Sequence, residues 1–271
     1  MHAASIHYTP DPGAPPGQPY NSRDDGEMEE ARRRIKQLEK LDATFLCNLS
    51  HEIRTPLTGI LGFAEVLAEE VGGEHRELAL LIGRSGERLM ETLTGILDLV
   101  QLERGEFELN LEPLSPVQCA REAVNHFRLQ AGEKGLSMTL DANGCGDVLA
   151  RTDSFALRRI ITNLISNAIK FTRQGTIRVS FEADRERVTL HVIDTGIGIR
   201  EEFLPFIFDE FKQESEGTSR HFEGTGVGLA VCRRMATLLH ADLSVESSRG
   251  VGSIFSLTLR RMSEIGASNK F

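Results

Sequence analysis

The chain has 271 residues, 40% of them hydrophobic, which suits a soluble globular protein of two domains. Its net charge of −9 and its pI near 5.5 argue against nucleic acid or an anionic membrane surface as a partner. The four cysteines form no CxxC pair, and no apolar run approaches the ~18 residues of a membrane span. We therefore expect reduced thiols, no membrane span in this chain and a cytoplasmic location.

The first part of the chain predicts a disordered tail followed by a long helix. Residues 1–22 hold five of the nine prolines together with glycines and polar residues, which is typical of disorder. Residues 23–45 are rich in charge and predict a coiled-coil lead-in. From Ile35 to Leu67 apolar residues recur every three or four positions, which predicts a helix that stops at the glycines of 71–73.

A second amphipathic run follows and ends near Arg104. Its apolar positions are Leu78, Ile82, Leu89, Leu93, Ile96 and Val100. Two long helices joined by a short turn predict an antiparallel hairpin over 35–105. Because a hairpin alone cannot bury two apolar stripes, we expect it to form a homodimer with a four-helix bundle.

The remaining sequence mixes helical and alternating patterns and predicts an α+β sandwich domain over 110–261, with a C-terminal tail over 262–271. The predicted helices cover 116–133, 153–170 and about 226–239. The predicted strands cover 107–114, 136–142, 176–183, 187–194, 242–247 and 253–259.

The predicted helix over 153–170 carries a polar row on one face. Asn163, Asn167 and Lys170 lie within ~60° of one another on a helical wheel, opposite a face of isoleucines, leucine and alanine. Such a row is either a solvated surface or the wall of a binding site.

Two glycine-rich motifs accompany this row. DTGIGI at 194–199 ends a predicted strand, and GTGVGL at 224–229 begins a predicted helix, where free N–H groups suit phosphate. Each motif alone is weak, because turns also use glycine. Neither is a dinucleotide-binding GxGxxG or a P-loop GxxxxGK[ST], so both of those sites are excluded.

The order of these motifs resembles the sensor histidine kinases of two-component systems. FLCNLSHEIRTPL resembles the family's H box, NLISNAIKFT its N box and FIFDEF its phenylalanine box, and the two glycine motifs resemble its glycine boxes. The resemblance spans about 230 residues with every box in order. It implies a dimerisation and phosphoacceptor hairpin followed by an ATP-binding domain of the gyrase and histidine-kinase type.

The resemblance also assigns roles in binding ATP and Mg²⁺. Asp194 would recognise the adenine amino group, Asn167 would be the main Mg²⁺ ligand with Asn163 beside it, and Lys170 would contact phosphate. Gyrase-type ATPases have a water-activating glutamate where this chain has Asn163. The other implied ATP-binding residues are Gly196, Gly198, Phe208, Phe211, Arg220, Gly224, Gly226, Gly228 and Leu229.

His51 is the phosphoacceptor that the resemblance implies. Its position ~200° around the helix from Ile53 leaves it outside the apolar stripe, and Thr55 excludes an HExxH zinc site. Glu52 would act as its base, and Thr55 would orient water for dephosphorylation of the partner. Pro56 cannot donate a hydrogen bond to the Glu52 carbonyl, which predicts a hinge.

The function implied is ATP-dependent autophosphorylation of His51, followed by phosphoryl transfer to an aspartate in the receiver domain of a response regulator. The alternatives are a non-catalytic dimeric scaffold and a phosphotransfer protein or phosphatase that uses Glu52 and Thr55. The intact boxes argue against both as the main function. The chain departs from the family at Ala156 and Arg159, where arginine and glutamine are common, and no sensor, receiver or membrane module is expected within it.

Overall fold

The computed structural model describes residues 51–105, 107–146, 148–214 and 226–262. All of them belong to one compact unit. The predicted tail over 1–22, the lead-in over 23–45 and most of the predicted tail over 262–271 lie outside the described residues.

A helical hairpin comes first in the described chain. Residues 51–70 are helical, and α2 (Gly73–Glu103) returns after a short turn in which Gly73 adopts a positive φ of 59°. The two helices pack closely, because a Cβ on Gly86 would lie 2.8 Å from Leu61 Cδ2. The hairpin buries small side chains between its helices, chiefly Ala64, Ala68 and Ala79, together with Leu57.

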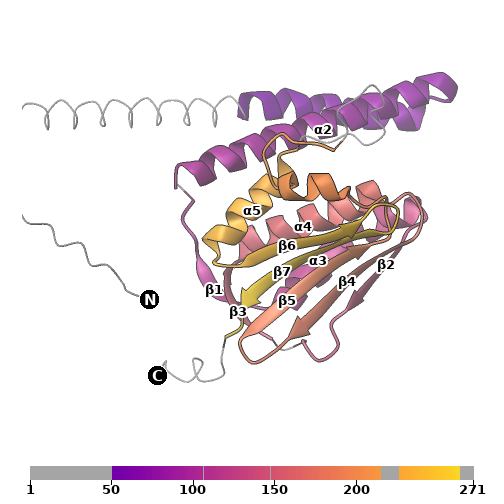
Figure 1. The fold of residues 1–271 in the computed structure, drawn as a ribbon. Helices are drawn as coiled ribbons and strands as arrows, with labels where there is room; N and C mark the ends of the chain where they lie inside the picture. The colour runs from indigo at the N-terminus through magenta and orange to yellow at the C-terminus, as the bar shows by residue number, and fades with distance from the viewer. Residues whose placement is uncertain (1–50, 106, 147, 215–225, 263–271) are drawn as a thin grey trace, which may run out of the picture. The chain divides into compact units, whose positions relative to one another are not determined.

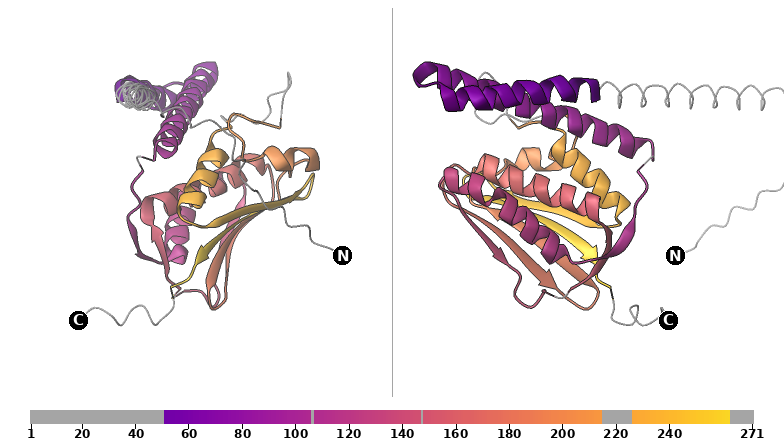
Figure 2. Two further views of the ribbon diagram at one scale, coloured as in Figure 1. Left: turned by 60° about the vertical axis from the view of Figure 1, so that its left-hand side comes forward. Right: turned by 180° about the vertical axis from the view of Figure 1, so that it is seen from behind.

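The rest of the chain is a sandwich of helices on a sheet (Figure 1). Three helices, α3 (Pro116–Glu133), α4 (Ser154–Phe171) and α5 (Gly228–Leu238), cover one face, as Figure 2 shows from two more sides. The sheet has the order β2-β4-β5-β7-β6, with β2 and β4 parallel and the other pairs antiparallel. Its strands are β2 (Ser137–Asp141), β4 (Thr176–Ala183), β5 (Arg187–Asp194), β6 (Asp242–Ser248) and β7 (Gly252–Arg260).

Apolar and polar residues alternate along the central strands, which explains why helices cover only one face of the sheet. Every second residue of β4, β5 and β7 is buried against the helices, and the residues between them are mainly Ser, Thr, Arg and His. The predicted fold class, a helical hairpin followed by an α+β sandwich, is confirmed.

Four elements differ from the sequence predictions. The predicted strand over 107–114 is reduced to β1 (Leu111–Leu114), which pairs with a strand that was not predicted, β3 (Ala150–Asp153). A short 3₁₀ helix, η1 (Glu201–Phe206), was also not predicted. The predicted helix over 226–239 begins at Gly228. The first strand shortens because only four of its residues have a partner strand.

The start of α4 is fixed by Asp153. Its Oδ1 accepts a hydrogen bond from the Ala156 N–H at 2.8 Å, and its Oδ2 accepts one from the Asn110 N–H at 2.9 Å. One carboxylate therefore caps the helix and ties it to the chain before β1.

We expect Asp153→Ala to lower the free energy of unfolding by about 1–2 kcal/mol, because two backbone N–H groups lose their acceptor. Asp153→Asn keeps one side-chain oxygen and should lose less. Urea unfolding of the three proteins measures the difference. An alanine variant as stable as the wild type would show that the cap does not position α4.

Candidate functional site

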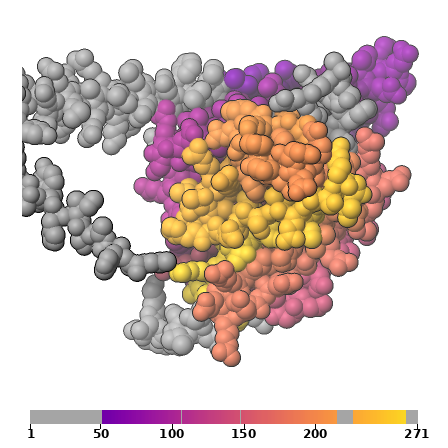
Figure 3. All heavy atoms as spheres, viewed as in Figure 1, coloured from indigo at the N-terminus to yellow at the C-terminus, as the bar shows by residue number. Residues whose placement is uncertain are grey.

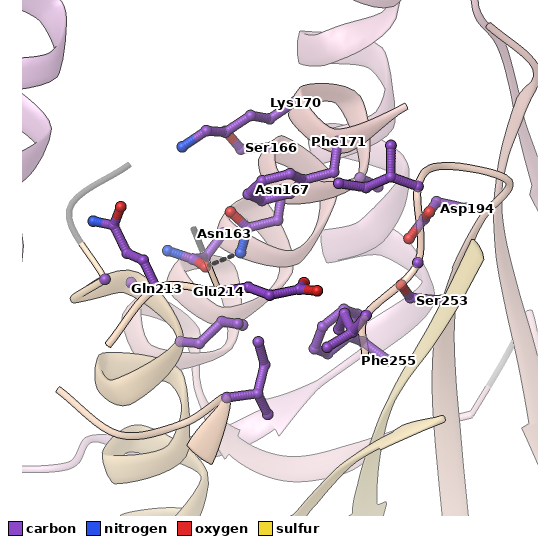
Figure 4. Close-up of a pocket in the computed structure, with 18 of the residues that line it drawn as sticks. Asn163, Ser166, Asn167, Lys170, Phe171, Asp194, Gln213, Glu214, Ser253 and Phe255 are labelled. Carbon is purple, nitrogen blue, oxygen red and sulfur yellow. Dashed lines mark hydrogen bonds between the residues drawn. The ribbon is translucent and has the colours of Figure 1, made fainter. Parts of the chain in front are cut away.

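A cavity of about 800 Å³ lies among α4, the segment after β5, the start of α5 and part of α2. Figure 4 shows Asn163, Asn167 and Lys170 on α4 and Asp194 and Ser253 across from them. The predicted polar row therefore lines a cavity and is not a solvated surface. Figure 3 shows the outer surface of the same molecule.

The two asparagines are one helical turn apart and contact each other. The Asn167 Nδ2 donates a hydrogen bond to Asn163 Oδ1 at 3.0 Å, and no described residue donates a hydrogen bond to the side-chain oxygen Oδ1 of Asn167. Amide oxygens are suitable Mg²⁺ ligands. No group of three His, Cys, Asp or Glu residues suited to a metal occurs in the described chain. A Mg²⁺ ion here would therefore depend on amide, phosphate and water oxygens, and the residues present fit that set.

Asp194 is a buried carboxylate held in one orientation. Its Oδ1 accepts a hydrogen bond from the Gly196 N–H at 2.8 Å, and Ser253 donates to the carboxylate from its backbone and its hydroxyl. Burial raises the pKa of Asp194 above its ordinary value, and these hydrogen bonds oppose the rise. Gly196 is required for this approach, because a Cβ there would lie 2.7 Å from Asp194 Oδ1.

The other predicted glycines allow backbone segments to approach closely around the cavity. Gly198 has a φ of 63°, and a Cβ there would lie 2.0 Å from the Ser248 carbonyl oxygen. A Cβ on Gly228 would lie 2.3 Å from Asn163 Nδ2. Both glycines line the cavity, as do Gly226 and Leu229. Gly224 and Arg220 lie outside the described residues.

The two phenylalanines of FIFDEF behave differently from each other. Phe208 packs against the hydrophobic core. Phe211 is 62% exposed and has a positive φ of 60°, and its backbone N–H donates to the Gly226 carbonyl at 3.0 Å. Neither ring lines the cavity. The implied roles of Phe208 and Phe211 in binding ATP stay predictions, and in this structure Phe211 contacts the second glycine motif through its backbone.

His51, Glu52 and Thr55 are exposed on the first helix, and none of them lines the cavity. The Thr55 hydroxyl donates to the His51 carbonyl at 3.2 Å. The helix continues through Pro56 to residue 70. The hinge at Pro56 stays a prediction.

Sequence reasoning missed several residues of the site. Ser253 holds Asp194, and Glu91 and Gly95 bring the hairpin to the cavity wall. At the cavity edge, Glu214 accepts hydrogen bonds from Arg200 Nε at 2.8 Å and Arg249 Nη1 at 3.1 Å. These residues come from separate elements, so no local spacing in the sequence could have brought them together.

Two family models match the chain. Residues 42–105 match the His Kinase A (phospho-acceptor) domain, and residues 152–263 match the histidine kinase-, DNA gyrase B- and HSP90-like ATPase. Together the matches cover more than half of the chain.

Two curated proteins are similar to this chain over most of its length. The chain is 37% identical over 236 residues to the autoinducer 2 sensor kinase/phosphatase LuxQ of Vibrio cholerae, covering 84% of this chain and 27% of LuxQ. It is 38% identical over 220 residues to the circadian input-output histidine kinase CikA of Synechococcus elongatus, covering 79% of this chain and 29% of CikA. The chain thus spans less than a third of the length of these curated relatives.

Solved structures agree with the fold. Full-length ShkA in complex with AMPPNP superposes with a TM-score of 0.64 at 29% identity, covering 80% of this chain and 46% of ShkA. The histidine kinase AdeS of Acinetobacter baumannii, at 22% identity and a TM-score of 0.54, has the same fold over 78% of this chain and 97% of AdeS. In the described part of the chain, no helix has the length and hydrophobicity needed to cross a bilayer.

Asp194→Asn should separate stability from binding. Because the pKa of Asp194 is raised in the folded state, the stabilisation from its bound proton is lost as the pH rises through that pKa, and its ionised form opposes folding at pH 7. We expect the variant without nucleotide to be at least as stable as wild type in urea, whereas its affinity for ATP falls by ~1–3 kcal/mol.

Asp184→Asn is the matched control. Asp184 lies outside the cavity, and hydrogen bonds from the Glu186 and Arg187 N–H groups lower its pKa. This variant should lose stability at pH 7 and bind ATP as wild type does. Unchanged ATP affinity in Asp194→Asn would contradict the placement of adenine.

Proposed function

Because the chain belongs to the sensor histidine kinases of two-component systems, we propose that it uses ATP to phosphorylate His51 and passes the phosphoryl group to an aspartate of a response regulator. One observation carries this proposal. A single chain holds an exposed histidine within the H-box sequence and a cavity lined by Asn163, Asn167 and Asp194. A scaffold without turnover has no need of a buried carboxylate beside an enclosed polar row.

The residues of the cavity support binding of ATP with its adenine at Asp194 and its phosphates toward Asn163. Asp194 and Ser253 lie across the cavity from the asparagines (Figure 4). The start of α5 at Gly228 approaches Asn163, and its N–H groups suit a phosphate. A bound Mg²⁺ would neutralise charge on the phosphate oxygens.

The chemistry proposed for His51 is nucleophilic attack by the neutral ring. The Nε2 lone pair forms a bond to the γ-phosphorus while the bond to the bridging oxygen breaks, and that electron pair leaves with ADP. Glu52, next to His51, accepts the Nδ1 proton. Because His51 does not line the cavity, either the ATP-binding domain moves or the pocket of a second protomer serves it.

Dephosphorylation of the response regulator is a second proposed activity. Thr55 is exposed one helical turn after His51, and LuxQ is named a kinase/phosphatase. The Thr55 hydroxyl would first have to release the His51 carbonyl.

A homodimer is proposed because the outer face of the hairpin is apolar. Large hydrophobic side chains are exposed along both helices of a single chain: Ile60, Phe63, Val66, Leu67, Leu78, Leu81, Ile82 and Leu89. So many exposed apolar side chains on one helical hairpin favour a protein interface there. The four-helix bundle would cover it.

We expect His51→Gln to abolish the acid-labile, alkali-stable label from γ-labelled ATP while leaving ATP binding unchanged, because His51 lies outside the cavity. Asn167→Ala should instead lose both binding and labelling in the presence of Mg²⁺, because a predicted metal ligand is removed. Wild-type labelling of the His51→Gln protein would refute the assignment.

Light scattering should give the chain a mass twice its 30.0 kDa at micromolar concentration. Phe63→Asp should shift the mass to that of the monomer, because it places a charge in the proposed interface. Leu129→Asp is the matched control, since both residues are 74% exposed and Leu129 lies on α3. A monomeric wild type, or equal effects of both substitutions, would argue against the bundle.

A further inference from the structure

The C-terminal part of α2 is packed into the ATP-binding domain. Leu99 and Leu102 belong to the same hydrophobic core as Val227, Ala230 and Val231 around the start of α5. A Cβ on Gly95 would lie 2.9 Å from Val227 Cγ1. The hairpin therefore contacts the second glycine motif directly, at one end of the proposed ATP pocket.

An ion pair between Asp98 and Arg159 lies in this contact. Asp98 Oδ2 accepts a hydrogen bond from Arg159 Nε at 2.8 Å and lies 2.8 Å from Arg159 Nη2. The Asp98 side chain is 11% exposed and that of Arg159 30% exposed. Water therefore screens this pair less than a surface pair, and the carboxylate commits two of the guanidinium nitrogens.

Arg159 also belongs to the polar row of α4. It precedes Asn163 by four residues and Asn167 by eight, so it lies on the same face of the helix and lines the same cavity. It extends the row at the end opposite Lys170. Gly228, which approaches Asn163, lines the same cavity, and the phosphates of ATP are proposed to lie toward Asn163.

Asp98 has a second cationic neighbour on the phosphoacceptor helix. Burial raises the pKa of Asp98, and the charges of Arg159 and of Arg54 both oppose the rise. Arg54 lies three residues after His51. The Asp98 carboxylate thus interacts electrostatically with one arginine on α4 and with another on the helix that carries His51.

We propose that Arg159 is a phosphate-binding residue of the kinase reaction, and that Asp98 withholds it from ATP while α2 is packed in the present arrangement. This inference rests on the proposed kinase function. A triphosphate and the Asp98 carboxylate are both anions and repel each other. The Arg159 guanidinium therefore cannot keep its ion pair with Asp98 and bind the phosphate equally well. When α2 shifts, Arg54 remains as a cation for Asp98 and Arg159 turns to the γ-phosphate.

The proposal predicts opposite effects for the two partners of the ion pair. Asp98→Asn releases Arg159 and should raise the affinity for Mg·AMPPNP and the rate of autophosphorylation. Arg159→Gln should lower both by roughly tenfold, the usual scale for a charge-assisted hydrogen bond. If the pair only braces the hairpin, both substitutions move both quantities in the same direction, and the proposal is overturned.

The γ-phosphate gives a second, independent readout. Arg159→Gln should weaken the binding of Mg·AMPPNP but leave that of ADP unchanged, because only the triphosphate reaches Arg159. Arg159→Lys keeps the charge without the planar fork and should recover part of the affinity. Equal losses for both nucleotides in the glutamine and lysine variants would overturn the phosphate contact.

Arg158→Gln is the matched control. Arg158 neighbours Arg159, pairs with Glu122 on α3 and does not line the cavity, so its substitution should change neither affinity. In the same titration, Asn167→Ala distinguishes a misplaced ATP pocket from a wrong role for Arg159. If it retains Mg·AMPPNP binding, the ATP pocket itself is misplaced. If it loses binding while Arg159→Gln binds both nucleotides as wild type does, only the role of Arg159 fails.

Discussion

The structure depends on the two faces of α4. Its apolar face, including Ile160, Ile161 and Leu164, is fully buried in the core, which fixes how the helix is rotated about its axis. The same rotation places the polar row of Asn163, Asn167 and Lys170 along the cavity, so no additional contact is needed to orient these side chains. A rotation of one residue, about 100°, would bury amides and expose isoleucines, so the packing of the core and the geometry of the site cannot vary independently.

Backbone contacts opposite α4 fix the second wall of the cavity. The carboxylate of Asp194 is oriented by Gly196 and Ser253, and a Cβ on Gly252 would lie 2.0 Å from the Asp194 carbonyl oxygen. The glycines near this wall therefore serve mainly contacts within the chain, where larger residues would force strands and turns apart. Through these contacts the glycines determine the orientation of one buried carboxylate and the shape of the cavity.

Periodicity predicted most of the fold, and the motifs predicted the composition of the site. β4 and β5 have the predicted bounds because eight alternating residues carry a clear signal. β3 was missed because its four residues, ARTD, show no alternation and depend on pairing with β1. The pair of Asp98 and Arg159, 61 residues apart, and the exposed ring of Phe211 arise from tertiary packing and backbone conformation, which local patterns do not encode.

The central claim is that ATP bound in this cavity supplies a phosphoryl group to a histidine nitrogen. A ³¹P NMR spectrum of the purified chain incubated with Mg·ATP tests it most directly, because a phosphorus–nitrogen bond has a resonance distinct from those of phosphate esters and free phosphate. The account predicts a protein-bound phosphoramidate signal that disappears on acidification and persists in alkali. A spectrum with only ADP and inorganic phosphate, or with a phosphate ester on the protein, would contradict it.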